Sequence, residues 1–290
     1  MPDPLALLQT VEAIAANHRG DVALFAENLR TGQTVGLHAD EVVQTASVIK
    51  LAILYEAMQQ VRARKARFDD RIVMREADQV PRSGVLLFFD TPMTLTLKDA
   101  LTMMIAMSDN TATNLVIDHV GLANINQRIQ ELGLKNTYLY RKVFRPVEGT
   151  APGDHKRFGL GKTTPREMAA LMRKIATCEP AEAGTASGAN DRQLCQDMLH
   201  MLRNQFYRGG IPRYLGSMYT DTESVIANKT GELNAVRNDV AAIDAKEGML
   251  ILSIFTWNNR DQSWSVENEG EITIAKLARA IVAAWSPADL

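Results

Sequence analysis

Apolar residues at the start of the chain follow first a helical spacing and then a strand pattern. Residues 4–18 place apolar side chains three and four positions apart, and Gly20 ends the run, which predicts an amphipathic helix. Residues 21–29 and 34–38 are short apolar-rich runs, and the turn between them contains Gly32. Two such runs around a glycine-containing turn predict a β-hairpin.

Strand patterns return near the end of the chain. Residues 224–229, 238–243 and 248–257 are apolar-rich runs, and residues 244–248 form a turn between the last two. The near-continuous apolar run 248–257 is typical of a central buried strand. Residues 271–284 resume the helical spacing and predict a closing amphipathic helix.

Helical patterns dominate the middle of the chain, with loops at residues 79–84 and 145–165 and an Ala- and Gly-rich surface loop at 181–190. Strands at both ends and helices between them predict an α/β protein of the α+β kind, with an antiparallel sheet of about five strands flanked by terminal helices. Residues 1–43 and 204–290 would form this discontinuous α/β lobe. Residues 44–203 would form an inserted all-α lobe.

Composition and charge narrow the class of protein. The 290 residues, 46% of them hydrophobic and 23% charged, are typical of a globular protein with a packed core. No run approaches the roughly 18–20 apolar residues of a membrane span, so we expect no membrane segment. A net charge of −2 with interspersed signs lacks the basic stripe of nucleic-acid-binding proteins, which argues against a nucleic-acid partner.

Cysteines and histidines give no sign of a metal site. Cys178 and Cys195 are the two cysteines of the chain; they are too few for a disulfide framework and have no zinc spacing, so we assign them no function. The five histidines are scattered without a paired ligand pattern. We therefore expect neither a metal nor another cofactor.

Ser47-x-x-Lys50 is the first of three motifs that describe an acyl-transfer site. Ser47 precedes an apolar run that predicts a buried helix, and Lys50 lies one turn further on the same face. An amine there can activate a serine hydroxyl, and a helix N-terminus favours the oxyanion of a tetrahedral intermediate. The structural alternative makes Ser47 a helix cap and Lys50 a solvated residue.

Ser108-Asp109-Asn110 lies between an apolar stretch and the predicted helix 111–119. As a catalytic motif, Ser108 would pass a proton to the leaving nitrogen, Asn110 would hold a substrate carbonyl, and Asp109 would shape the turn. A polar turn between helices is the alternative.

Lys229-Thr230-Gly231 follows the predicted strand 224–228. Lys229 and Thr230 can meet the carboxylate of a substrate that lies along the strand edge, and Gly231 would let the substrate backbone approach. Arg237 is a further candidate for that carboxylate. These residues predict an anionic acyl donor.

The joint occurrence of the three motifs in this order, about 60 and then about 120 residues apart, matches the signature of penicillin-recognising serine enzymes. The chain resembles the class A β-lactamases, within the larger superfamily of penicillin-binding proteins and D-alanyl-D-alanine peptidases. The matching stretches are residues 44–50, 80–86, 107–115, 163–165, 229–231 and 238–241. The resemblance implies an α/β lobe and an all-α lobe with the active site between them.

One stretch departs from the resemblance. Class A β-lactamases carry a loop glutamate that holds the water for deacylation, and the corresponding stretch here is 141–154. Aligning Pro146 with the family proline places Arg145 at the glutamate position, whereas aligning Pro152 places Phe144 there. Glu148 is therefore the candidate deacylation base.

Three interpretations follow from this departure. If Glu148 or Lys50 activates water, the chain is a β-lactamase that forms and hydrolyses an acyl-enzyme on Ser47. If neither does, it is a D-alanyl-D-alanine peptidase or esterase-like penicillin-binding protein, or a β-lactam sensor that acylates without turnover. The partner is then a small-molecule β-lactam or a D-Ala-D-Ala-like peptide, and the protein is expected to be a monomer.

Residues 1–3 begin no positively charged segment followed by an apolar one. The chain would then be either cytoplasmic or the mature form of an exported protein. The resemblance favours a periplasmic or secreted location.

Overall fold

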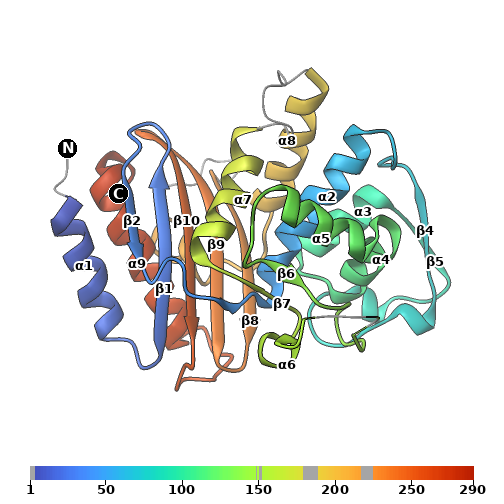
Figure 1. Ribbon diagram of the computed structural model, residues 1–290, viewed down its shortest axis with the longest axis horizontal. Coiled ribbons are helices and arrows are strands. Elements are labelled where there is room, and N and C mark those ends of the chain that lie inside the picture. Colours follow the sequence, from blue (N-terminus) through green and yellow to red (C-terminus); the bar gives the residue numbers. More distant parts are fainter. Residues whose placement is uncertain (1–3, 148, 150–151, 179–188, 217–224) are drawn as a thin grey trace.

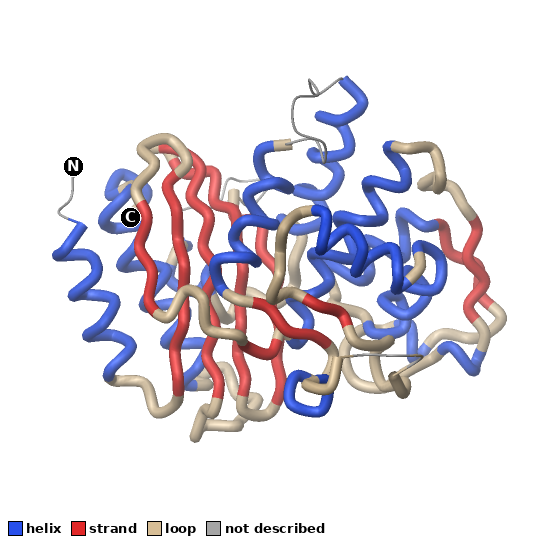
Figure 2. The backbone as a smooth tube through the Cα atoms, viewed as in Figure 1, coloured by secondary structure: helices blue, strands red, loops and turns tan. Residues whose placement is uncertain are grey.

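A five-stranded antiparallel sheet with strand order β2-β1-β10-β9-β8 forms the centre of the fold (Figures 1 and 2). The computed structural model describes residues 4–147, 149, 152–178, 189–216 and 225–290. The strands of the sheet are β1 (Asp21–Asn28), β2 (Thr34–Leu37), β8 (Ile226–Leu233), β9 (Val236–Ala245) and β10 (Gly248–Trp257). Both ends of the chain thus contribute to one sheet, and the predicted fold class is confirmed.

Strand β10 lies in the middle of the sheet because its side chains are apolar on both faces. Leu252 on one face and Phe255 on the other are fully buried, and β10 pairs with β1 on one side and β9 on the other. The apolar run had predicted this central position. Strand β8, at the edge, is longer than predicted: it continues to Leu233 and so contains the Lys-Thr-Gly motif.

Helices α1 (Pro4–Ala16) and α9 (Glu269–Trp285) cover one face of the sheet (Figure 1). Both present apolar side chains to it, including Val11 and Ile281, which are fully buried. Asn268 begins α9 by accepting hydrogen bonds from the backbone N–H groups of Gly270 and Glu271. The two predicted terminal helices therefore form one layer.

Helix α7 (Pro165–Thr177) crosses the opposite face, over β1, β9 and β10, and α8 (Ala189–Arg203) packs against β8. Helix α2 (Lys50–Arg62) is buried along its first nine residues and lies at the centre of the helical part. The remaining α-helices described are α3 (Leu97–Ala106), α4 (Asn110–Val120), α5 (Leu122–Glu131) and α6 (His155–Phe158). Short 3-10 helices are η1 (Ala46–Ile49), η2 (Glu76–Asp78), η3 (Leu86–Phe88), η4 (Ile211–Tyr214) and η6 (Pro287–Asp289).

Two small sheets accompany these helices. One has the order β3-β7-β6 and the other pairs β4 with β5. Their strands are β3 (Val43–Gln44), β4 (Arg71–Met74), β5 (Met93–Thr96), β6 (Tyr138–Leu139) and β7 (Gly161–Thr163). These strands were not predicted, because runs of two to four residues are too short to show a strand period.

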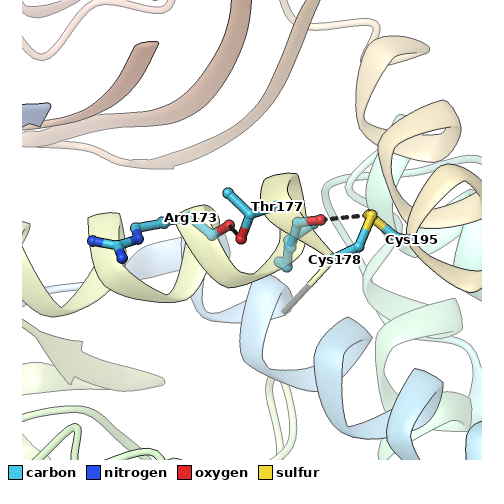
Figure 3. Close-up of a disulfide and its surroundings, with 5 residues drawn as sticks. Arg173, Thr177, Cys178 and Cys195 are labelled. Carbon is cyan, nitrogen blue, oxygen red and sulfur yellow. Dashed lines mark hydrogen bonds between the residues drawn. A yellow bond between two sulfur atoms is a disulfide. The ribbon is translucent and has the colours of Figure 1, made fainter. Parts of the chain in front are cut away.

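A disulfide joins Cys178, directly after α7, to Cys195 in α8 (Figure 3). No function was predicted for these cysteines from the sequence. Their pairing depends on the side-by-side packing of α7 and α8, which cysteine spacing alone does not reveal. The predicted surface loop 181–190 lies almost wholly outside the described residues. Across the described parts of the chain, no helix is both long and apolar enough to span a bilayer.

Candidate active site

Ser47 lies in the 3-10 turn η1, immediately before α2, rather than in the first turn of the α-helix itself. The preceding Ala46 has a φ of 44°, a left-handed conformation that is uncommon outside glycine and often marks functional sites. The Ser47 side chain lines a cleft, and its hydroxyl has no hydrogen-bond partner among the described residues. The hydroxyl is therefore open to an incoming molecule.

The Lys50 amine is fully buried next to the second motif. Its Nζ lies 2.7 Å from the Ser108 carbonyl oxygen, 3.1 Å from Ser108 Oγ and 3.2 Å from Asn110 Oδ1. Burial, together with the nearby Lys229 amine, lowers the pKa of Lys50 well below its ordinary value. A lysine in this state is neutral more readily than a solvated one and can accept a proton.

The Ser108-Asp109-Asn110 turn is held by the Asp109 carboxylate. Asp109 caps α4 by accepting from the Ala112 N–H, and it also accepts from the N–H groups of Val85, at 2.7 Å, and Leu86, at 2.9 Å. Ser108 has a φ of 51°. The carboxylate thus ties the turn to the segment 80–86, as expected for a shaping role.

Lys229 reaches the same serine from β8. Its Nζ donates to Ser108 Oγ at 3.0 Å and to the Thr230 carbonyl at 2.9 Å. Burial lowers the pKa of Lys229 to about 7, although the carboxylates of Glu232 and Asp239 oppose the change. Ser108 Oγ therefore bridges two buried amines, and all three motifs meet at it.

Asp239 lies opposite Thr230 on β9. Burial raises the pKa of Asp239 to about 7. Hydrogen bonds that Asn228 Nδ2 and the Ile211 N–H donate to the carboxylate act in the opposite direction and lower this pKa. These contacts anchor β8 behind the Lys-Thr-Gly motif.

Gly231 allows η1 to approach the edge of the sheet. A Cβ at this position would lie 2.6 Å from the Thr45 carbonyl oxygen and 2.9 Å from the backbone nitrogens of Ser47 and Val48. The sequence analysis expected the glycine to admit a substrate backbone. The structure shows that the close neighbour is the turn that carries Ser47.

The cleft has a volume of about 410 Å³ and combines residues of the sheet with residues of the helical part. Of the predicted site residues, it brings together Ser47, Ser108, Asn110 and Thr230, with Lys50 and Lys229 buried beside Ser108. Its other lining residues are Ala46, Arg82, Ser83, Arg141, Val143, Phe144, Phe158, Gly159, Leu160, Tyr207, Glu232, Leu233 and Trp264.

Arg237, the further candidate for a substrate carboxylate, does not line the cleft. Its guanidinium is 1% exposed, donates to three backbone carbonyl groups and lies 3.5 Å from the Glu271 carboxylate. It also stacks 4.6 Å from the centre of the Trp264 ring. Through these contacts the Arg237 side chain holds β9 and the neighbouring loop together.

The loop at residues 141–147 reaches the cleft through Arg141, Val143 and Phe144. Asn114 holds Val143 by two hydrogen bonds, of 2.7 Å to its N–H and 3.0 Å to its carbonyl. Arg145 instead donates to the Ala77 carbonyl. Glu148, the candidate base, lies outside the described residues.

Glu232 is the one carboxylate among the described residues that line the cleft. Glu232 was not among the predicted site residues, although its position directly after Lys-Thr-Gly on an edge strand was a usable signal. No group of three or more histidine, cysteine or acidic side chains suited to a metal ion occurs in the described ranges.

A family model described as the beta-lactamase enzyme family matches residues 6–285. The chain belongs to the beta-lactamase enzyme family. A β-lactamase of Rhodobacter capsulatus is 25% identical over 284 residues, which cover 96% of this chain and 88% of that protein. A β-lactamase of Aeromonas hydrophila is 27% identical over 80% of this chain and 72% of that protein.

Solved structures of the beta-lactamase family share the whole fold. A β-lactamase from Sphaerobacter thermophilus is 31% identical, with a TM-score of 0.80 and coverage of 97% of both chains. A protein named PBP-A has the same fold at 24% identity, with a TM-score of 0.77 over 96% of this chain and 95% of that one. The predicted family and the serine β-lactamase-like hydrolase function are confirmed by these matches.

Proposed function

We propose that this chain opens the amide of penicillin- and cephalosporin-type β-lactams through an acyl-enzyme on Ser47. The observation that carries the proposal is the convergence of the three motifs: Ser108 Oγ lies within 3.1 Å of both the Lys50 and the Lys229 amines. Ser47 lines the same cleft with an uncommitted hydroxyl.

Acylation needs a base for Ser47 and an acid for the leaving nitrogen. Ser47 Oγ attacks the lactam carbonyl and gives its proton to the neutral Lys50 amine, while the N-terminus of the η1 turn favours the oxyanion. The carbon–nitrogen bond then breaks, and the nitrogen takes the proton of Ser108 Oγ. Ser108 regains a proton from the Lys50 ammonium, to which it is hydrogen-bonded.

Substrate binding uses both walls of the cleft. Lys229 in its cationic form and the Thr230 hydroxyl meet the carboxylate of the acyl donor, and the Asn110 amide holds its side-chain carbonyl. Gly231 keeps the Ser47 turn close to this strand, so the carboxylate and the scissile carbonyl are held at once.

Hydrolysis of the acyl-enzyme requires a base for water, and Glu148 or Lys50 would supply it. A second candidate function is favoured by the loop at 141–147, whose described residues place no carboxylate in the cleft. Without a positioned base the acyl-enzyme persists. The chain would then be a D-alanyl-D-alanine peptidase, an esterase-like penicillin-binding protein or a β-lactam sensor.

We also propose a cellular location for the protein. The Cys178–Cys195 disulfide is typical of an oxidising compartment, which favours a periplasmic or secreted protein over a cytoplasmic one. We propose a monomer in which residues 1–43 with 204–290 form one lobe and residues 44–203 the other, with the site between them.

Hydrolysis of a chromogenic cephalosporin, followed beyond one equivalent, separates the two functions. Sustained turnover supports a β-lactamase, whereas a burst of one equivalent supports a penicillin-binding peptidase or sensor. Glu148→Gln should trap the adduct if Glu148 is the deacylation base.

Intact-mass analysis after incubation with a penicillin should show an adduct that Ser47→Ala abolishes. Ser83→Ala is the matched control, because Ser83 lines the same cleft but has no amine beside it. An adduct that survives in the Ser47→Ala variant would refute Ser47 as the nucleophile.

A further inference from the structure

Two arginines line the helical wall of the cleft. Arg82 and Arg141 are both lining residues, and neither guanidinium forms a hydrogen bond or an ion pair with a described residue. The Arg82 guanidinium lies 5.7 Å from the centre of the Phe144 ring, which also lines the cleft. This wall therefore carries two positive charges without a protein counter-ion in the described part of the chain.

The backbone places this wall beside Asn110. The Asn110 side chain donates to the Pro81 carbonyl at 3.1 Å, and its N–H donates to the Ser83 carbonyl at 3.0 Å. Arg82 lies between these two anchors. Its φ of 76°, like the 53° of Phe144, is a left-handed value that is uncommon for such residues.

The charges of the cleft are segregated between its two walls. Glu232, the carboxylate of the lining, follows Thr230 on β8, on the wall that would receive the donor's own carboxylate. The arginines lie on the Asn110 wall, which would receive the acyl side chain. Because unpaired guanidinium groups bind carboxylates with charge-assisted, often bidentate hydrogen bonds, the arginine wall suits an anion.

We infer that Arg82 and Arg141 determine specificity for acyl donors that carry a second carboxylate on the acyl side chain. The inference rests on the proposed function and names the substrate class of the same site. The donor's first carboxylate lies with Lys229 and Thr230, and the second extends past Asn110 to the two guanidinium groups. Phe144 supports Arg82 in this position.

Two penicillins that differ in one carboxylate test the inference. We would measure acylation efficiency for α-carboxybenzylpenicillin and benzylpenicillin, by adduct mass against time if the adduct accumulates and by kcat/KM of ring opening if it turns over. Arg82→Gln and Arg141→Gln should each lower the efficiency with the carboxylated penicillin by about tenfold, the effect of one charge-assisted hydrogen bond. Benzylpenicillin should react at an unchanged rate, and added salt should narrow the wild-type preference.

Arg145→Gln is the matched control. Arg145 belongs to the same loop but does not line the cleft and donates to the Ala77 carbonyl, so its loss should leave the ratio of the two efficiencies unchanged. A matched pair of acyl-D-alanyl-D-alanine peptides, with and without the second carboxylate, shows whether the same preference for a second carboxylate applies to peptide donors.

The outcomes distinguish failure of the inference from failure of the proposed function. Adducts that form with an unchanged ratio in both arginine variants overturn the inference alone. If neither penicillin forms an adduct and neither is hydrolysed, the proposed function fails and the inference fails with it. A selective loss with the carboxylated donor in either arginine variant supports both.

Discussion

Burial determines the chemistry of the two lysines. Lys50 and Lys229 are both fully buried, and the loss of water around each amine favours its neutral form. Ser108 Oγ stands between them, so one hydroxyl links the amine proposed as base to the amine proposed to bind the carboxylate. Substitution of either lysine should therefore alter the hydrogen bonding of Ser108 Oγ.

The rate of acylation should depend on pH in opposite directions through these two amines. Because the pKa of Lys50 is lowered, its amine is a base above that lowered value, and acylation should slow as pH falls through it. The pKa of Lys229 is about 7, so its cation is lost above about pH 7 and substrate binding should weaken there. A bell-shaped pH profile of kcat/KM is expected, with its alkaline limb above about pH 7.

A variant of one lysine shows which limb of the pH profile that lysine controls. Lys229→Arg, which stays cationic at all accessible pH values, should remove the fall on the alkaline side while the acid limb remains. An alkaline limb that persists in this variant would show that another group controls it.

At the scale of elements, the position of Ser47 depends on how closely η1 approaches β8. Gly231 lies at this contact, and the short distances from a Cβ at this position are to backbone atoms, which cannot rotate away. Neither element alone would place the nucleophile beside the edge strand.

Gly231→Ala should reduce acylation efficiency by about 100-fold or more, because a misplacement of about 1 Å at a reacting group has that effect. The two elements must separate to admit the methyl group, so the thermal midpoint should also fall. Gly153→Ala is the control, since a Cβ there meets no atom within 4 Å. Full activity in Gly231→Ala would contradict the proposed role of this contact.

At the scale of the whole molecule, both termini complete one sheet and the helical part packs on the face opposite α1 and α9 (Figures 1 and 2). The Cys178–Cys195 disulfide lies within this helical part, between α7 and α8 (Figure 3). Neither cysteine lines the cleft. The bond should therefore affect stability rather than catalysis.

Removing the disulfide should lower the free energy of unfolding by about 3 kcal/mol, since the cysteines are 17 residues apart and a loop of this length constrains the unfolded chain by about that amount. The Cys178→Ala, Cys195→Ala double variant should melt several degrees lower, and acylation efficiency should not change. Alanine avoids a polar group at Cys195, which is 1% exposed. An unchanged melting temperature would argue against a stabilising bond.

Much of the fold and the motif residues were accessible from the sequence because they depend on local patterns. The run 248–257 predicted a central strand, and residues 111–119 predicted the helix that is α4. The strand that carries Lys229 was predicted too short, because its polar residues hide the strand pattern. Arg237 was a plausible ligand by residue type, yet its contacts direct it to backbone carbonyls and Glu271.

The sequence by itself determined the main strands and the terminal helices, the family and the identity of the motif residues, because hydrophobic periodicity and motif spacing are properties of the chain. The tertiary structure alone decided the bridge at Ser108, the disulfide, the burial of Lys50 and Lys229, and the charges of the cleft walls. These depend on distances between residues far apart in sequence. Such distances, and the loss of water that shifts a pKa, arise only when the elements pack together.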